Sequence, residues 1–151
     1  CLDQQLAGEI ANDSRFSVLA QIVAAFDGWS KFRLEAPAQY QLLDQFLTSP
    51  DRALDPEGLV AVNERLDPIL HRLAQLLGRA GEVGALSPGD AQGRTHLLWA
   101  AVHGLEHFRK RDSTQPENLH VDNLRPMMIK SLLMGWGAPK GLVESVLAQA
   151  G

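Results

Sequence analysis

Apolar residues recur at every third or fourth position along almost all of this chain, the spacing that lines one face of an α-helix. Between Arg15 and Glu35 two such stripes lie side by side, which predicts burial on more than one side. The period-two alternation of a half-buried strand is nearly absent, and no Asn-Gly or Asp-Gly turn separates β-branched runs. We therefore predict an all-α protein of six to seven helices, packed as an orthogonal or antiparallel bundle.

Prolines and small polar residues mark the predicted ends of these helices. Pro37 opens one helix and Asp55-Pro56 another, while Ser87-Pro88-Gly89-Asp90 predicts a third with Ser87 as its N-cap. Pro68 falls inside a predicted helix, so we expect either a kink or a fresh start capped by Asp67. The predicted helices are Cys1–Ala11, Arg15–Glu35, Pro37 to about Ser49, Pro56–Gly81, Ser87–Arg111, Asn123–Gly135 and Leu142–Ala150, with a loop over Ser113–His120.

The length and charge of the chain exclude several classes of protein. Residues 1–151 make one domain, and the net charge of −4, with acids and bases interleaved, gives no basic face for nucleic acid. No apolar run reaches the roughly 18 residues of a membrane helix, and the single cysteine, Cys1, rules out an internal disulfide framework. We expect a cytoplasmic protein without a membrane partner.

Sequence motifs for catalysis are also missing. There is no Gly-x-Ser-x-Gly elbow, no phosphate-binding loop and no cysteine in a helical pocket. Glu117 and His120 form a single Glu-x-x-His pair, whereas a di-iron bundle needs two such pairs and further carboxylates. We predict that the protein is not an enzyme and carries no cofactor.

The predicted helix Ser87–Arg111 has apolar residues on more than one face. We assign one half of it to the core: Leu97, Leu98, Ala101, Val102, Leu105 and Phe108. The other half carries Trp99, Ala100, Gly104, His96, His103 and His107. A narrow polar strip with Thr95, Glu106 and Lys110 is left to face water.

Gly104 predicts a subunit interface. Glycine inside a helix costs about 0.5 to 1 kcal/mol relative to alanine, so a close approach of another backbone would explain it. The predicted helix Asn123–Gly135 is also apolar almost all round, and we expect these two helices to form a four-helix bundle with their copies in a homodimer. The predicted interface residues are Ala100, Gly104, His107, Met127, Met128, Ser131 and Met134.

The histidines raise the question of a metal site. His103 and His107 have the i, i+4 spacing at which two imidazoles can share a metal ion. No acid or cysteine cluster accompanies them in the sequence, so we expect packing or pocket lining and no metal. A stand-alone helical metal-binding bundle remains an alternative.

Four segments together resemble the C-terminal regulatory domain of tetracycline-repressor (TetR) family transcriptional regulators. They are APAQYQLL (Ala36–Leu43), AGEVGALSPGDA (Ala80–Ala91), LLWAAVHGLEHF (Leu97–Phe108) and LLMGWGAP (Leu132–Pro139), in that order. The third segment includes Trp99 and the His103-Gly104 pair. The resemblance spans most of the chain.

The resemblance implies a homodimeric, all-helical domain that holds a small-molecule effector of unknown identity. Proteins of this family are most often repressors and bind operator DNA through an N-terminal helix-turn-helix domain. That domain is missing from these residues, and Cys1–Ala11 would be the remnant of the helix that connects to it. The predicted ligand-binding residues are Phe26, Trp29, Arg33, Tyr40, Leu43, Trp99 and His103, with Arg33 either meeting an anionic effector or facing water. A ligand-free dimerisation module is a further alternative.

Overall fold

The computed structural model describes residues 13–49 and 55–151, and the regular structure in these ranges is entirely helical. Six α-helices occur there: α2 (Ser14–Glu35), α3 (Pro37–Thr48), α4 (Pro56–Glu82), α5 (Ala91–His107), α6 (Val121–Gly135) and α7 (Lys140–Ala150). Two short 3-10 helices, η1 (Phe108–Thr114) and η2 (Glu117–Leu119), join α5 to α6. The predicted all-α class is confirmed, while the predicted helix Cys1–Ala11 lies outside the described residues.

Aspartate side chains cap the first turns of α2 and α4, because a carboxylate can accept hydrogen bonds from the free N–H groups at a helix N-terminus. Asp13 accepts from the backbone N–H of Arg15 at 2.9 Å, and Asp55 accepts from that of Gly58 at 2.8 Å. α3 has a proline in its first turn, as Pro37 predicts. These local signals explain why the sequence places the starts of the three helices within one or two residues.

The start of α5 differs from the prediction. Asp90 rather than Ser87 is the N-cap, accepting a hydrogen bond from the backbone N–H of Gln92. Ser87 is held elsewhere, since its backbone N–H donates to the carbonyl of Trp136 at 2.8 Å. Gly137 has a φ of 95°, which suits glycine, and a side chain there would collide with Ser87. A contact between distant parts of the chain therefore delays the start of the helix.

Pro68 lies inside α4 without dividing it. The helix runs unbroken from Pro56 to Glu82, so the predicted fresh start capped by Asp67 is wrong. Proline cannot donate to the carbonyl one turn earlier, that of Glu64. Both Pro68 and Glu64 are exposed, so water can bind that carbonyl. The exposed position explains how the helix tolerates a proline.

The remaining helix ends differ from the prediction by short segments. α5 gives way to 3-10 geometry at Phe108, whereas the sequence predicts an α-helix as far as Arg111. The predicted loop over Ser113–His120 contains η2, and α6 and α7 each begin two residues earlier than predicted. None of the helices in the described ranges is both long enough and apolar enough to span a membrane.

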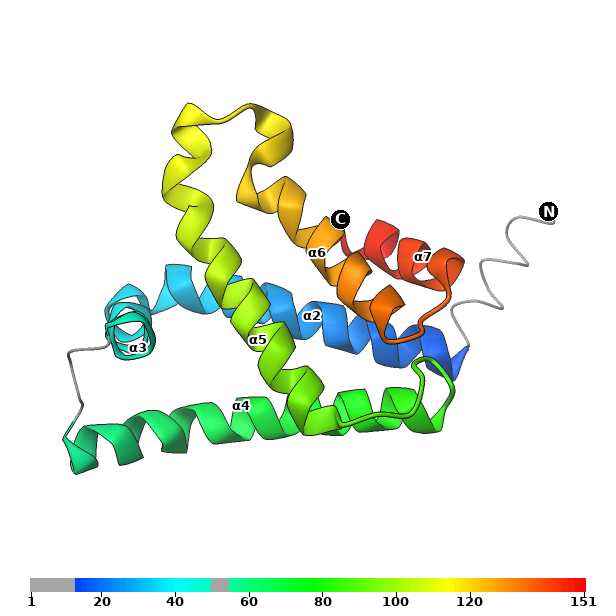
Figure 1. Ribbon diagram of the computed structural model, residues 1–151, viewed down its shortest axis with the longest axis horizontal. Helices are drawn as coiled ribbons and strands as arrows, with labels where there is room; N and C mark the ends of the chain where they lie inside the picture. The colour runs from blue at the N-terminus through cyan, green and yellow to red at the C-terminus, as the bar shows by residue number, and fades with distance from the viewer. Residues whose placement is uncertain (1–12, 50–54) are drawn as a thin grey trace.

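α2 lies at the centre of the helical packing (Figure 1). It packs against α3, α4 and α7, while α5 crosses α4 and packs against α6. Both apolar stripes of α2 are buried, as their width predicts, through Phe16, Val18, Leu19, Ile22, Val23, Phe26 and Trp29. The core is therefore built around one helix that is covered on several sides.

The faces of α5 are only partly as predicted. Leu98 and Val102 are buried in the core, but Leu97 is 60% exposed and Phe108 is 53% exposed. The strip expected to face water is instead buried at Thr95 and Glu106. Helical spacing shows which residues share a face, but the neighbouring helices decide which face is covered.

Candidate ligand-binding cavity and histidine cluster

Four of the residues predicted to bind a ligand meet in one aromatic cluster. The ring of Trp29 on α2 lies 6.1 Å from that of Tyr40 on α3 and 6.0 Å from that of Trp99 on α5, between centroids. His103, one turn after Trp99, lies 6.0 Å from Trp29 and 5.7 Å from Tyr40. Rings at these separations interact favourably and restrict one another's orientation.

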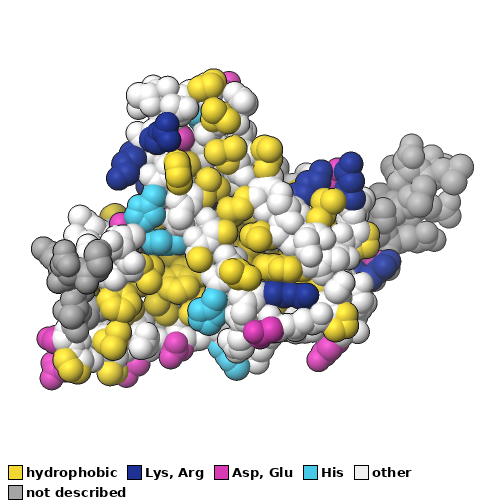
Figure 2. All heavy atoms as spheres, in the orientation of Figure 1, with side chains coloured by type: hydrophobic (Ala, Val, Ile, Leu, Met, Phe, Trp, Pro, Cys, Tyr) yellow, Lys and Arg dark blue, Asp and Glu magenta, His cyan; other side chains and the backbone are white. Residues whose placement is uncertain are grey.

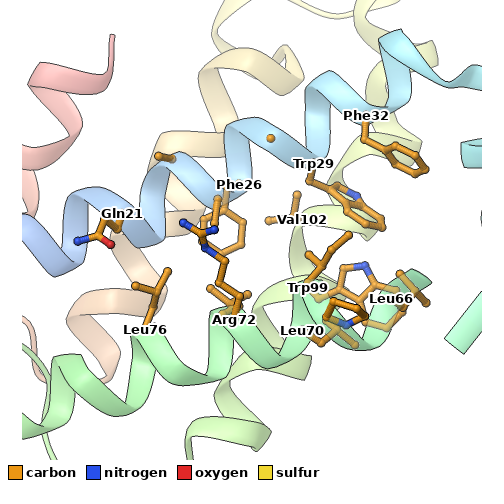
Figure 3. A pocket seen from close by; sticks show the side chains of 16 residues that line it. Gln21, Phe26, Trp29, Phe32, Leu66, Leu70, Arg72, Leu76, Trp99 and Val102 are labelled. Carbon is orange, nitrogen blue, oxygen red and sulfur yellow. The ribbon is translucent and has the colours of Figure 1, made fainter. Parts of the chain in front are cut away.

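A cavity of about 650 Å³ opens beside the aromatic cluster, between α2, α4 and α5. Figure 3 shows the side chains of Phe26 and Trp29 on α2 directed towards those of α4, with Trp99 contributed by α5. Its lining is mainly apolar: Gln21, Ala24, Ala25, Phe26, Gly28, Trp29, Phe32, Leu66, Pro68, Ile69, Leu70, Arg72, Leu73, Leu76, Trp99 and Val102. Volumes of about 300 to 1,000 Å³ with such linings are typical of small-molecule sites.

Two hydrogen-bond donors of residues that line this cavity have no acceptor. The indole N–H groups of Trp29 and Trp99 are buried, and neither has a partner among the described residues. An unpaired buried donor costs about 1–3 kcal/mol. Both residues line the cavity, but these two nitrogen atoms are themselves buried.

The other predicted ligand-binding residues lie outside this cavity. Arg33 and Tyr40 line a separate hollow of about 370 Å³ on the α3 side of α5, together with Asp44, Glu106, His107, Arg109 and Lys110. His103 is buried within the aromatic cluster, and Leu43 is buried in the core. The structure thus divides the seven predicted residues between a cavity, a hollow and the core, and ligand binding by any of them stays a prediction.

Glu106 lines this second hollow and is buried, although the helical pattern of the sequence predicts that it faces water. Its side chain is only 1% exposed. It accepts hydrogen bonds from Arg109 at 2.9 Å, from Arg125 at 2.7 Å and from the hydroxyl of Ser30 at 3.2 Å. The Nε of Arg33 lies 3.4 Å from its Oε2. Arg33 therefore faces a buried carboxylate of the protein itself, a role that the sequence did not reveal.

These surroundings shift two pKa values in opposite directions. Burial alone would raise the pKa of Glu106, but the hydrogen bonds and charges of Arg109 and Arg125 outweigh it, so the pKa lies below its ordinary value of 4.5. Burial and the negative charges of Asp44 and Glu106 raise the pKa of Tyr40 to about 12. At neutral pH the hollow thus contains an ionised Glu106 and a neutral phenol.

The histidine pair has an acidic neighbour that the sequence analysis missed. Asp44, on α3, places its Oδ1 atom 3.0 Å from Nε2 of His103 and 2.7 Å from Nε2 of His107. The three side chains form a group whose potential ligand atoms all lie within 4.8 Å of one another. Helical spacing predicts the two histidines on one face, but only the packing of α3 brings the carboxylate to them.

No family model, curated protein or solved structure matches the chain. The resemblance to TetR-family regulators therefore depends on the four sequence motifs. In the structure they occupy α3, the turn from α4 into α5, the body of α5, and the end of α6 with the turn that follows it. Two of these motifs carry residues of the aromatic cluster, namely Tyr40 on α3 and the Trp99–His103 pair on α5.

The residues predicted for a subunit interface lie mostly on the surface of the protomer. Ala100, Gly104, Met127, Ser131 and Met134 are exposed, and His107 and Met128 are half-buried. Leu97 on α5 and Phe108 at the start of η1 extend the exposed apolar surface beyond the predicted set. Figure 2 shows hydrophobic side chains gathered over the face on which α5 and α6 lie.

Gly104 makes no close contact that would explain a glycine within the protomer. A Cβ atom added there would meet nothing within 4 Å in the described part of the chain. The predicted close approach of another backbone to Gly104 is therefore not made by α2, α4 or α6. The approach of a partner subunit to Gly104 stays a prediction.

Proposed function

We propose that this domain binds a small-molecule effector and forms homodimers, as the regulatory part of a TetR-like transcriptional regulator, and that the regulator is a repressor released by its ligand. The observation that carries the proposal is the mainly apolar cavity of about 650 Å³ between α2, α4 and α5, with Trp29 and Trp99 among its lining residues. Its lining suits a largely apolar, ring-containing molecule.

The exposed apolar surface of α5 and α6 supports the dimer. Met127 is 62% exposed and Leu97 is 60% exposed, and both lie on helices that otherwise contribute to the core. Large exposed apolar side chains that cluster on one face are typical of protein interfaces. In the resembled family two helices from each protomer form such an interface, which fits α5 and α6.

The cavity and the proposed interface share α5, so an effector in the cavity could change the arrangement of the two protomers. A ligand changes the arrangement of two protomers only if it binds one arrangement more tightly than the other. Operator half-sites are about one helical turn of DNA, or 34 Å, apart, so the spacing of two helix-turn-helix domains must match that distance. We infer that a ligand held against α5 would alter this spacing, with operator DNA contacted only through such N-terminal domains.

The experiment fills the cavity without removing any of its aromatic walls. Gly28 lines the cavity, and a Cβ added there meets nothing within 4 Å in the described structure, so Gly28→Leu should be tolerated. Ligands that raise the melting temperature of the wild-type chain, identified from a panel of aromatic metabolites, should lose that effect in Gly28→Leu. Gly141→Leu on α7, also with free space around it, is the control and should keep the ligand-induced shift.

The outcomes separate the proposal from its alternative. Shifts of equal size in Gly28→Leu and wild type would place the ligand outside this cavity and contradict the proposal. No shift from any member of the panel, with dimers still formed, would favour the ligand-free dimerisation module.

A helical metal-binding protein is a second candidate function, and a separate observation favours it. Asp44, His103 and His107 form a compact group of potential ligands. None of the three is among the residues that line the apolar cavity, so within the described structure the two functions are compatible.

A further inference from the structure

Asp44, His103 and His107 form a compact group of potential metal ligands, whose ligand atoms all lie within 4.8 Å of one another. Both histidine Nε2 atoms approach the same carboxylate oxygen, at 3.0 Å and 2.7 Å. Yet neither contact has the direction of a hydrogen bond, and all three atoms are buried without a hydrogen-bond partner among the described residues. An N–H group lies in the plane of the imidazole ring, so at these distances a true hydrogen bond would aim it at the oxygen.

Metal coordination requires distances close to these two. Bonds of about 2.1 Å that meet at angles between octahedral and tetrahedral separate two ligand atoms by about 3.0 to 3.4 Å. The two measured contacts lie at or slightly below this range, so a small outward movement of His107 would fit an ion. His107 has room for it, because its side chain is 32% exposed.

His103 is held in a fixed orientation beside Asp44. Its side chain is 8% exposed, and its ring packs against those of Trp29, Tyr40 and Trp99 at 5.7 to 6.4 Å. These ring contacts restrict the orientation of the imidazole, so Nε2 is held 3.0 Å from the carboxylate oxygen.

We propose that Asp44, His103 and His107 bind one divalent transition-metal ion of the zinc type. Two imidazoles and one carboxylate favour Zn²⁺, Co²⁺ or Ni²⁺ over Mg²⁺ and Ca²⁺, which prefer sets of oxygen ligands. Three protein ligands leave at least one coordination position for water or a ligand atom. Asp44 and His107 also line the hollow of about 370 Å³, which gives the ion a path from solvent.

The charges around the hollow define what could share the metal. Arg33 and Arg109 point to the buried Glu106, and Lys110 also lines the hollow. Arg33, Arg109 and Lys110 outnumber Asp44 and Glu106 among the lysine, arginine and carboxylate side chains that line the hollow. An anionic oxygen ligand would therefore suit the open position better than a cationic one.

The test uses the 151-residue chain without a histidine tag. Co²⁺ should bind with one ion per chain and give visible absorption bands, which Zn²⁺ should then abolish by displacing it. His107→Ala and Asp44→Asn should each weaken Zn²⁺ binding by about 100-fold, measured by calorimetry. His96→Ala is the matched control, because His96 is exposed on the same helix and its Nδ1 lies 2.9 Å from the carbonyl of Gln92.

Two results would overturn the proposal. One is stoichiometric binding that survives both His107→Ala and Asp44→Asn. The other is weak binding that His96→Ala lowers as much as His107→Ala does, which would identify adventitious binding by surface histidines. Circular dichroism of each metal-free variant checks that a lost site is not a lost fold, and the half-exposed His107 is the safer of the two positions. Since Gly28→Leu leaves the three ligands untouched, this test and the cavity test can fail independently.

Discussion

Glu106 shows how much one buried carboxylate can organise. Arg109, Arg125 and Arg33 approach it from η1, α6 and α2, three different elements. Withdrawing a charge from water is costly, and its ion pairs offset that cost only when they are intact. Glu106 therefore stabilises the fold only while its ion pairs with the three arginines are intact.

Replacing Glu106 with glutamine should destabilise the fold. The substitution keeps the size of the side chain but leaves the arginines facing a neutral group, and breaking a buried pair in this way costs about 3 kcal/mol. The free energy of unfolding from urea titration measures the effect. Glu144→Gln is the control, because Glu144 pairs with Lys130 on the surface and its loss should lie within the error of the measurement.

The pH dependence distinguishes charge from packing at this position. Since the pKa of Glu106 is lower in the folded state than its ordinary 4.5, its contribution is present above pH 4.5 and is lost as pH falls through the folded-state pKa. The difference between wild type and Glu106→Gln should therefore shrink on acidification below about pH 4.5. A difference that stays constant down to pH 3 would show that the glutamine disturbs packing instead.

The sequence predicts the contact partners of single residues less well than it predicts which residues share a helix face. It places Trp29, Tyr40, Trp99 and His103 in one predicted site, and the structure brings these four side chains together. It assigns Glu106 to water and omits Asp44 altogether. Partners such as these lie on other helices, and spacing along one helix contains no information about how a second helix is rotated against it.

α4 offers a test at the scale of an element. Pro68 lacks the N–H that would complete the helix, and a proline inside a helix costs up to about 3 kcal/mol, while its rigidity in the unfolded chain returns about 0.4 to 1 kcal/mol. Pro68→Ala should therefore raise the free energy of unfolding by about 1–2 kcal/mol. Thermal and urea denaturation followed by circular dichroism measure the change.

Pro56 is the matched control on the same helix. It occupies the first turn of α4, where no intrahelical donor is needed and proline is favoured. Pro56→Ala should leave stability unchanged or slightly reduced. An equal gain from both substitutions would mean that α4 is not strained at Pro68.

Elements were predictable where local chemistry decides them. Asp13, Pro37 and Asp55 open α2, α3 and α4 because capping and proline geometry act within a few residues. Ser87 has the same local signature, but its backbone N–H donates a hydrogen bond to the carbonyl of Trp136. Asp90 is the N-cap of α5 instead. The error arises where a tertiary hydrogen bond overrides a local preference.

At the scale of the whole molecule, the exposed face of α5 and α6 predicts association. Gly104→Arg places a long charged side chain in the middle of that face, where the protomer itself leaves free space, so folding should be unaffected. Sedimentation velocity should find wild type as a dimer and Gly104→Arg as a monomer. Gly141→Arg introduces the same side chain on α7 and should leave the dimer intact.

Both possible failures of this prediction are informative. A compact dimer that persists in Gly104→Arg would move the interface away from α5. A wild-type protein that remains monomeric at high concentration would leave Leu97, Phe108 and Met127 as a surface for some other partner.

Trp29 is next to both proposed binding sites, the apolar cavity and the histidine cluster. One side of its indole belongs to the wall of the apolar cavity, and its centroid is also 6.0 Å from His103 of the histidine cluster. A ligand that tilts the Trp29 ring in the cavity would also change how this ring packs against His103. If binding at one site changes the affinity of the other, thermodynamic linkage requires the metal ion and the organic ligand to change each other's affinity by the same factor. Trp29 would then couple the two binding sites.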